Sequence, residues 1–200
     1  MFIQNALRPL IIAAVTLGSL SGCSEQSAPP AAAASPGSPF EAFASIQEIM
    51  ASIIDPAADG VWDAVGTIVT AKGVEERQPH TEEEWFEVRH HALTLVEATN
   101  LLMIDGRRVV AAGNKITDEG FDGVLTTEAA QTKLDSEHAS FVGFAAALHE
   151  VAKEMLAAVD ARKPESMTLA GEKMDQVCEA CHTAFWYPTQ PIFSVTTNLK

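Results

Sequence analysis

The chain has 200 residues, 47% of them hydrophobic, and carries 27 acidic and 13 basic side chains, which gives a net charge of −14. This length allows one domain with a sizeable core. A surface this acidic argues against binding to nucleic acid or to anionic lipid headgroups. It favours a basic protein partner, and that attraction should weaken as salt is added.

Residues 1–22 have the features of an export signal. A short segment with Arg8 precedes an apolar run from Leu10, and the run is too short for a comfortable membrane span. The small residues Ser21 and Gly22 close the segment, as small residues do before a signal-peptide cleavage site. The segment is therefore predicted to direct export and then to be removed.

The end of this segment, Leu20-Ser21-Gly22-Cys23, resembles the lipobox of bacterial lipoproteins. The resemblance implies cleavage before Cys23, diacylation of its thiol and attachment to a bacterial membrane on the periplasmic side. Ser24, rather than Asp, follows Cys23, and in bacterial lipoproteins this favours the outer membrane. The alternative is an ordinary signal peptide with an incidental cysteine.

Residues 23–39 are predicted to be a disordered tether. From Ser24 to Pro39 the chain is rich in proline, alanine and serine and has no periodic apolar pattern. One domain is predicted over residues 40–188, and residues 189–200 form a C-terminal tail with no assigned structure.

The domain is predicted to be all-α, with four helical regions and no strands. The first region starts near Phe40, and its apolar face continues to about Ala71. Within it, Asp55-Pro56 marks either a kink or the start of a fresh helix, because proline disturbs a helix interior but suits a first turn. The residues that recur at spacings of three and four are Phe43, Ile46, Met50, Ile53 and Ala57.

The second helix has a clear start and end. Thr81-Glu82-Glu83-Glu84 is a capping box with acidic residues in the positive first turn. Asp105-Gly106 ends the helix. Residues 105–125 form a long connection, which is predicted to contain a short helical turn around Arg108–Ala112.

The third and fourth helices complete the predicted domain. The third is predicted over residues 127–162, because Leu134, Phe141, Leu148 and Met155 recur every seven residues, as in a helix bundle. The fourth is predicted to run from about Glu165 to Pro188.

The fourth helix carries the sharpest motif of the chain, Cys178-Glu179-Ala180-Cys181-His182. C-x-x-C-H is the attachment signature of c-type haem. Cysteines three residues apart in a helix lie on neighbouring turns of one side, so both thiols can form thioether bonds to one porphyrin edge. His182 lies one turn after Cys178 and can bind the iron as the proximal ligand.

Other interpretations of this motif are a structural disulfide, a redox-active C-x-x-C pair and half of a zinc site. A zinc site needs two more ligands, and the sequence has no second C-x-x-C and no H-x-x-x-H. A thioredoxin-like pair follows a strand, whereas this motif lies inside a helical pattern. If Cys23 carries lipid and Cys178 and Cys181 carry haem, no cysteine remains for a structural disulfide.

A haem motif inside a C-terminal helix, after three other helices, resembles the class II c-type cytochromes, which comprise cytochrome c prime and its low-spin, methionine-ligated relatives. The resemblance implies an antiparallel four-helix bundle with haem c on its last helix, electron transfer or diatomic gas binding, and often a homodimer. The chain departs from cytochrome c prime after His182, because Thr183-Ala184-Phe185-Trp186-Tyr187 contains no basic residue.

The sixth iron ligand distinguishes the functions that this family offers. In the low-spin relatives it is a methionine on the first helix, and Met50 lies in the corresponding place; an ordinary core methionine is the alternative. Met103 and Met174 are less suitable, and Met174 lies on the same helix as His182. Arg89 and Lys173 are candidate partners of the haem propionates, with ordinary surface ion pairs as the alternative.

Three functions follow as hypotheses. The first is a lipid-anchored periplasmic carrier of single electrons, with His182 and Met50 as axial ligands and a basic redox protein as partner. The second is a five-coordinate haem protein that binds or senses nitric oxide or carbon monoxide. The third is a metal-binding or structural bundle without haem. No catalytic constellation is present, so an enzyme is not expected.

Overall fold

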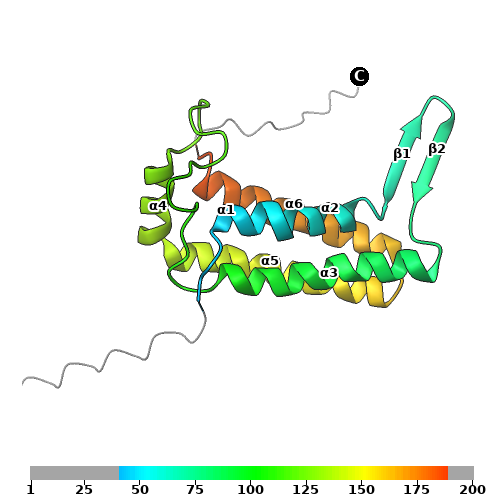
Figure 1. Cartoon of the computed structure of the whole chain (residues 1–200). Helices are drawn as coiled ribbons and strands as arrows, with labels where there is room; N and C mark the ends of the chain where they lie inside the picture. Colours follow the sequence, from blue (N-terminus) through cyan, green and yellow to red (C-terminus); the bar gives the residue numbers. More distant parts are fainter. Residues whose placement is uncertain (1–40, 189–200) are drawn as a thin grey trace, which may run out of the picture. The chain divides into compact units, whose positions relative to one another are not determined.

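The computed structural model describes residues 41–188; the signal segment, the tether with Cys23 and the tail over 189–200 lie outside them. The described chain is mostly helical, as predicted, and also contains one small antiparallel sheet (Figure 1). No helix of this part of the chain is long and apolar enough to cross a membrane.

The first helical region is continuous but contains a π-helical turn. It comprises α1 (Ile46–Ile49), the π-helical segment η1 (Met50–Ile54) and α2 (Asp55–Trp62). The turn ends two residues before Pro56, whose missing N–H interrupts the regular α-helical hydrogen bonds. The N–H of Asp55 bonds to the carbonyl of Met50, five residues back. The interruption predicted at Asp55-Pro56 is therefore a local change of helix type.

A β-hairpin follows, where helix was predicted to about Ala71 and no strand was expected. Strands β1 (Gly66–Thr70) and β2 (Gly73–Arg77) pair antiparallel, with Val69 opposite Val74. The prediction was wrong because the apolar spacing also fitted a helix, whereas Thr67-Ile68-Val69-Thr70 is a run of β-branched residues that favours strand. Gly73 begins β2 with a φ of 134°, which suits glycine and no helix.

Helix α3 (Glu82–Leu102) starts as predicted. The Thr81 hydroxyl accepts a hydrogen bond from the Glu84 N–H, and the Glu84 carboxylate accepts one from the Thr81 N–H, at 3.2 and 2.9 Å. In the connection after α3, residues 108–112 form no helix, so the short turn predicted there is absent. The buried guanidinium of Arg107 holds this connection by donating to the carbonyls of Leu101 and Ala44.

The third predicted helix is divided into α4 (Thr127–Ser136) and α5 (His138–Asp160). The backbone leaves helical geometry at Glu137, where φ is −120° and ψ is 28°. Leu134 packs in the main core, while Ala130 packs with Val110 and Ile116 in a small second core. The break lets α4 turn across the line of α5 and serve both cores (Figure 1).

Helix α6 (Pro164–Phe185) is the last element, and it begins one residue before the predicted start near Glu165. Proline suits this first position because its missing N–H has no partner there in any case. It packs on α5 and α2, while α3 packs on α5 and α2. At the crossing of α2 and α6, the Trp62 indole N–H donates to the Gly171 carbonyl over 3.2 Å. Residues almost completely buried between these helices include Val61, Leu95, Met155, Met167 and Met174.

Candidate functional site

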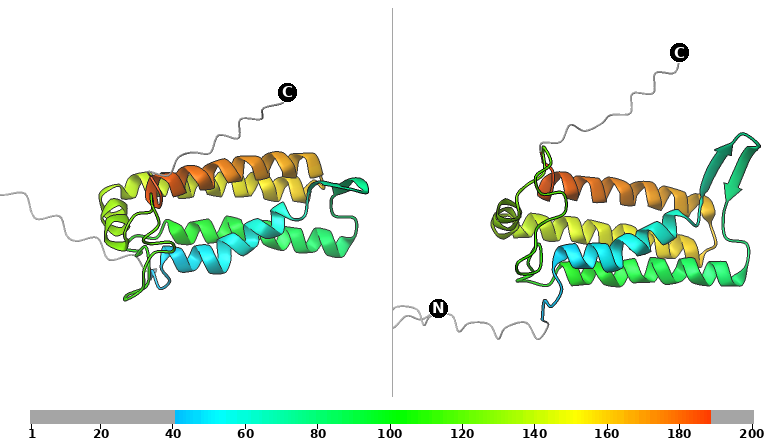
Figure 2. Two further views of the ribbon diagram at one scale, coloured as in Figure 1. Left: turned by 90° about the horizontal axis from the view of Figure 1, so that it is seen from above. Right: turned by 45° about the horizontal axis from the view of Figure 1, so that its top comes forward.

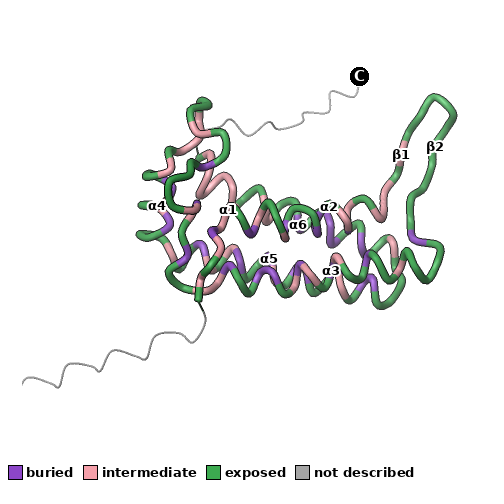
Figure 3. Tube along the Cα trace, viewed as in Figure 1, coloured by how far each residue is buried: buried purple, intermediate pink, exposed green. Residues whose placement is uncertain are grey.

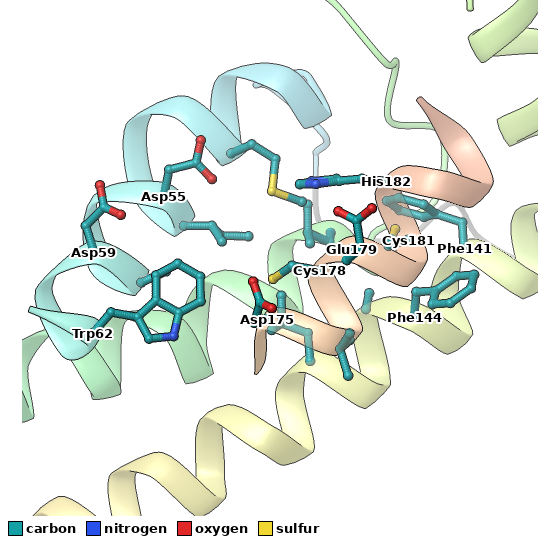
Figure 4. Close-up of a pocket in the computed structure, with 17 residues that line it drawn as sticks. Asp55, Asp59, Trp62, Phe141, Phe144, Asp175, Cys178, Glu179, Cys181 and His182 are labelled. Atoms are coloured by element: carbon teal, nitrogen blue, oxygen red, sulfur yellow. The ribbon is translucent and has the colours of Figure 1, made fainter. Parts of the chain in front are cut away.

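Helix α6 presents the motif residues Cys178, Cys181 and His182 to one cavity. All three are half-buried and line a space of about 230 Å³ between α6, α5 and the first helical region. Figure 4 shows Cys178 and His182 projecting from α6 toward the first helical region. Because this part of α6 is regular helix, the spacing of the motif puts both thiols and the imidazole on adjacent turns.

The walls of this first cavity are mainly apolar. Helix α5 contributes Phe141 and Phe144, and α2 contributes Trp62 (Figure 4). The Phe185 ring packs edge-on against both phenylalanines, with ring centroids 5.6 and 6.1 Å away. Further apolar lining comes from Ile54, Ala58, Leu102, Ala145, Leu148 and Val177.

A second cavity of about 320 Å³ adjoins the first. It lies between α1, α4, the end of α6 and the connection before α4, and its lining is again mostly apolar. The two cavities share Met50, Asp55, Phe141, Cys181 and His182. His182 and Met50 therefore stand where the two spaces meet, which makes the whole space larger than either cavity alone.

The two thiols are free and half-buried. Cys178 and Cys181 form no disulfide. Burial, with the nearby carboxylate of Asp175, raises the pKa of Cys178 to about 11, and burial raises the pKa of Cys181 to about 12. Both groups are thus protonated at neutral pH, which makes them poor metal ligands in this form.

The His182 imidazole is held in the neutral form by its surroundings. Burial lowers its pKa, partly opposed by the carboxylates of Asp55 and Glu179. The Trp186 ring packs on it edge-on, with ring centroids 5.3 Å apart. A neutral imidazole is the form that ligates a metal.

Met50 is the methionine that the fold brings to His182. It begins η1 and lines both cavities. Met103 lines neither cavity, and Met174 is fully buried in the core away from both. Of the three methionines considered from the sequence, only Met50 lies across the cavity from the motif.

Four carboxylates line the first cavity, and none of them was among the site residues predicted from the sequence. They are Asp55 and Asp59 on α2 and Asp175 and Glu179 on α6 (Figure 4). Burial raises the pKa of Asp55 above its ordinary value. A signal was present, because each pair is spaced by four residues and therefore shares a helix face. Only the fold shows that the two faces meet.

Glu179, inside the motif, also fixes the end of α6. Its carboxylate accepts a hydrogen bond from the Tyr187 hydroxyl at 2.7 Å, and burial together with this carboxylate raises the pKa of Tyr187. The Trp186 indole N–H donates to the Thr117 carbonyl at 3.0 Å. The aromatic run after His182 therefore packs on this helix and on the connection before α4.

The two candidate propionate partners are engaged elsewhere. Arg89 pairs with Asp160 at 2.7 Å, and Lys173 pairs with Glu154 at 2.6 Å. Neither basic residue lines a cavity that contains the motif. Both form the surface ion pairs that the sequence left as the alternative.

Comparisons of the chain with protein-family models, with curated proteins and with solved structures find no match. Within residues 41–188, no three His, Cys, Asp or Glu side chains are grouped so that they could hold a metal ion on their own.

Proposed function

We propose that this chain is an exported, lipid-anchored c-type cytochrome that carries single electrons through one covalently bound haem c. The observation that carries the proposal is the placement of two thiols, an imidazole and a thioether around two adjoining, mostly apolar cavities. Cys178 and Cys181 would attach the haem, His182 would be the proximal ligand and Met50 the sixth ligand.

The residues present fit this group. A haem is flat and largely apolar, and the cavities on either side of His182 have mostly apolar walls. Taken alone, the first cavity, about 230 Å³, is smaller than a usual ligand pocket of about 300–1,000 Å³, and the second, about 320 Å³, is at the lower end of that range. Because they meet at Met50 and His182, one larger ligand can use both.

The bound iron would supply the one-electron chemistry, and the chain's own residues would supply binding and tuning. His182 offers a neutral imidazole because burial disfavours its charged form. Met50 offers a soft thioether, which raises a haem's reduction potential and closes the sixth position to gases. Phe141, Phe144 and Phe185 would form an apolar wall beside the haem on this side of the motif.

The wider architecture that we propose is an antiparallel four-helix bundle formed by the first helical region, α3, α5 and α6. It is supported by the packing of α2 on α3, α3 on α5, α5 on α6 and α6 on α2. The export signal and lipid on Cys23, with attachment to the periplasmic side of a bacterial membrane, rest on the sequence alone. A basic redox protein is the proposed partner, and no enzymatic activity is proposed.

A pyridine haemochrome assay tests the proposal. The full chain would be matured in a bacterial host that attaches c-type haem, then purified and denatured. We expect one covalent haem per chain in the wild type and none in the Cys178→Ser, Cys181→Ser double variant.

Cys23→Ser is the matched control, because it removes a cysteine outside the motif. It should keep the haem but fail to incorporate labelled palmitate. Wild-type protein without covalent haem, made in a host that matures another c-type cytochrome, would refute the proposal.

A further inference from the structure

The β-hairpin is the one element of the described chain that no helix covers. It projects beyond the helices in every view (Figures 1 and 2), and its residues are exposed almost throughout (Figure 3). The cross-strand pair of Val69 and Val74 lies in solvent, with exposed fractions of 78% and 67%. Asp63 fixes only the base of the hairpin, because its carbonyl and carboxylate accept hydrogen bonds from Arg77.

A hairpin of this kind gains stability when another strand pairs with it. A two-stranded hairpin with no packed face is marginally stable in water, and an open strand edge offers unpaired N–H and C=O groups. Soluble proteins usually protect such an edge with charges or proline. The two edges here differ in this respect.

The β2 edge carries this protection and the β1 edge lacks it. Glu75, Glu76 and Arg77 lie along β2. From Val65 to Ala71 there is neither a charged residue nor a proline, in a chain whose net charge is −14. The β1 edge is therefore the surface on which another strand can add without opposing charges.

We propose that β1 pairs antiparallel with β1 of a second copy of this chain, which joins the two hairpins into one four-stranded sheet. The second copy is the fitting occupant because its β1 offers the same uncharged run of β-branched residues, Thr67-Ile68-Val69-Thr70. A two-fold axis perpendicular to the sheet places Ile68 opposite Ile68, or Val69 opposite Val69, with β-branched residues on either side. Pairs of this kind stabilise antiparallel sheets.

The expected association is weak and depends on salt in a characteristic direction. A pair of hairpins buries less than the roughly 1,200 Å² of a stable interface, so the dimer should be transient in solution. The two copies are both acidic and repel each other outside the strands, so added salt should strengthen the dimer. Docking of a basic partner should respond to salt in the opposite direction. The inference does not depend on the haem.

Disulfide trapping of the full chain in host membranes tests the pairing. Ile68→Cys and Val69→Cys place a thiol beside the axis, and Glu75→Cys places a matched thiol on the β2 edge. After mild oxidation, mass spectrometry of digested protein identifies which peptides are linked. We expect the introduced cysteine linked to itself in at least one β1 variant, several-fold more than in the β2 variant.

Three results would overturn the proposal: no self-linked peptide from either β1 variant, equal linkage from Glu75→Cys, or linkage of the β1 thiol to a different protein. A second measurement uses sedimentation of the purified, detergent-solubilised chain. Val69→Lys should weaken dimerisation about tenfold, since it opposes like charges across the axis. Glu75→Lys should leave dimerisation within about twofold of wild type. Equal effects of the two substitutions would also overturn it.

Discussion

Met50 lies at the start of a π-helical turn, and we attribute this turn to Pro56. Pro56 cannot donate to the helix, and the π-helical turn that precedes it begins at Met50. Turns of this kind are rare and often occur at functional sites. Here the turn lies opposite the motif helix, at the point where both cavities meet.

Replacing Met50 by alanine should open the sixth position of the iron. We expect the thioether absorption band of the oxidised protein to disappear and the ferrous protein to bind carbon monoxide rapidly. Absorbance spectroscopy of the purified holoprotein measures both. Met103→Ala is the matched control, because Met103 lines neither cavity and should leave both properties unchanged. A Met50→Ala spectrum identical to wild type would make Met50 a core residue only.

Glu119 gives the segment before α4 a dependence on acid. Its carboxylate accepts hydrogen bonds from the Thr127 N–H and hydroxyl and pairs with Lys115 at 2.6 Å. The Lys115 and Thr127 contacts lower its pKa from 4.5 to about 2. The folded state therefore gains stability from the ionised carboxylate above pH 4.5, and this gain is lost as the pH falls toward 2.

Glu119→Gln should remove this dependence. We expect the variant to be less stable than wild type at pH 7 and the difference to shrink as the pH falls below 4.5. Hydrogen exchange of residues 115–127 across this range measures it. A constant difference at all pH values would show that the carboxylate charge is not the cause.

At the scale of the elements, the start of α3 was readable from the sequence, whereas the hairpin and the break at Glu137 were not. The Thr81 capping box marked the start of α3, because its side chains satisfy specific backbone hydrogen bonds. The hairpin was missed because its apolar spacing fits two structures. The break at Glu137 was missed because no proline or glycine marks it and it serves a second core distant in sequence.

The part of the site that lies on one helix was predictable, and the part contributed by other helices was not. The motif residues lie together because a single helix sets their spacing. The four carboxylates and the phenylalanine wall come from different elements, so only the packing of α2, α5 and α6 brings them to the motif.

Helix contacts that depend on glycine give a test of the packing. A Cβ on Gly60 of α2 would lie 2.4 Å from the His91 ring of α3. Gly60→Ala should therefore destabilise the protein by about 1–3 kcal/mol, although alanine favours helix by about 1 kcal/mol. Gly143→Ala in α5 is the control, because nothing lies within 4 Å of its added Cβ, and it should stabilise. Urea unfolding of the holoprotein measures both.

Adding His91→Ala to Gly60→Ala should recover most of the lost stability, because it removes the clashing ring. Failure of the double variant to recover would mean that α2 and α3 do not approach each other at this position.

At the scale of the whole molecule, haem and fold should stabilise each other. Without haem, the cavities around Met50 and His182 leave their lining side chains without partners, which costs free energy of folding. The Cys178→Ser, Cys181→Ser chain should therefore melt several degrees below wild type, since about 1 kcal/mol shifts a domain of this size by about 3 °C. Thermal circular dichroism, with Cys23→Ser as the haem-containing control, measures the shift. Equal melting temperatures would argue against a haem that fills this space.

The acidic surface should act at the same scale. Electron transfer to a basic redox protein should slow as ionic strength rises, whereas pairing of two hairpins should strengthen. The two responses separate the partner proposed for the site from the partner proposed for the β1 edge.

The absorbance spectrum of the purified ferrous holoprotein, recorded before and after addition of carbon monoxide, tests the central proposal most directly. We expect a Soret band that carbon monoxide does not shift rapidly, because in our proposal the Met50 thioether occupies the sixth position of an iron held by His182. A rapid and complete shift would contradict ligation by Met50, and the absence of a Soret band after competent maturation would contradict haem attachment itself.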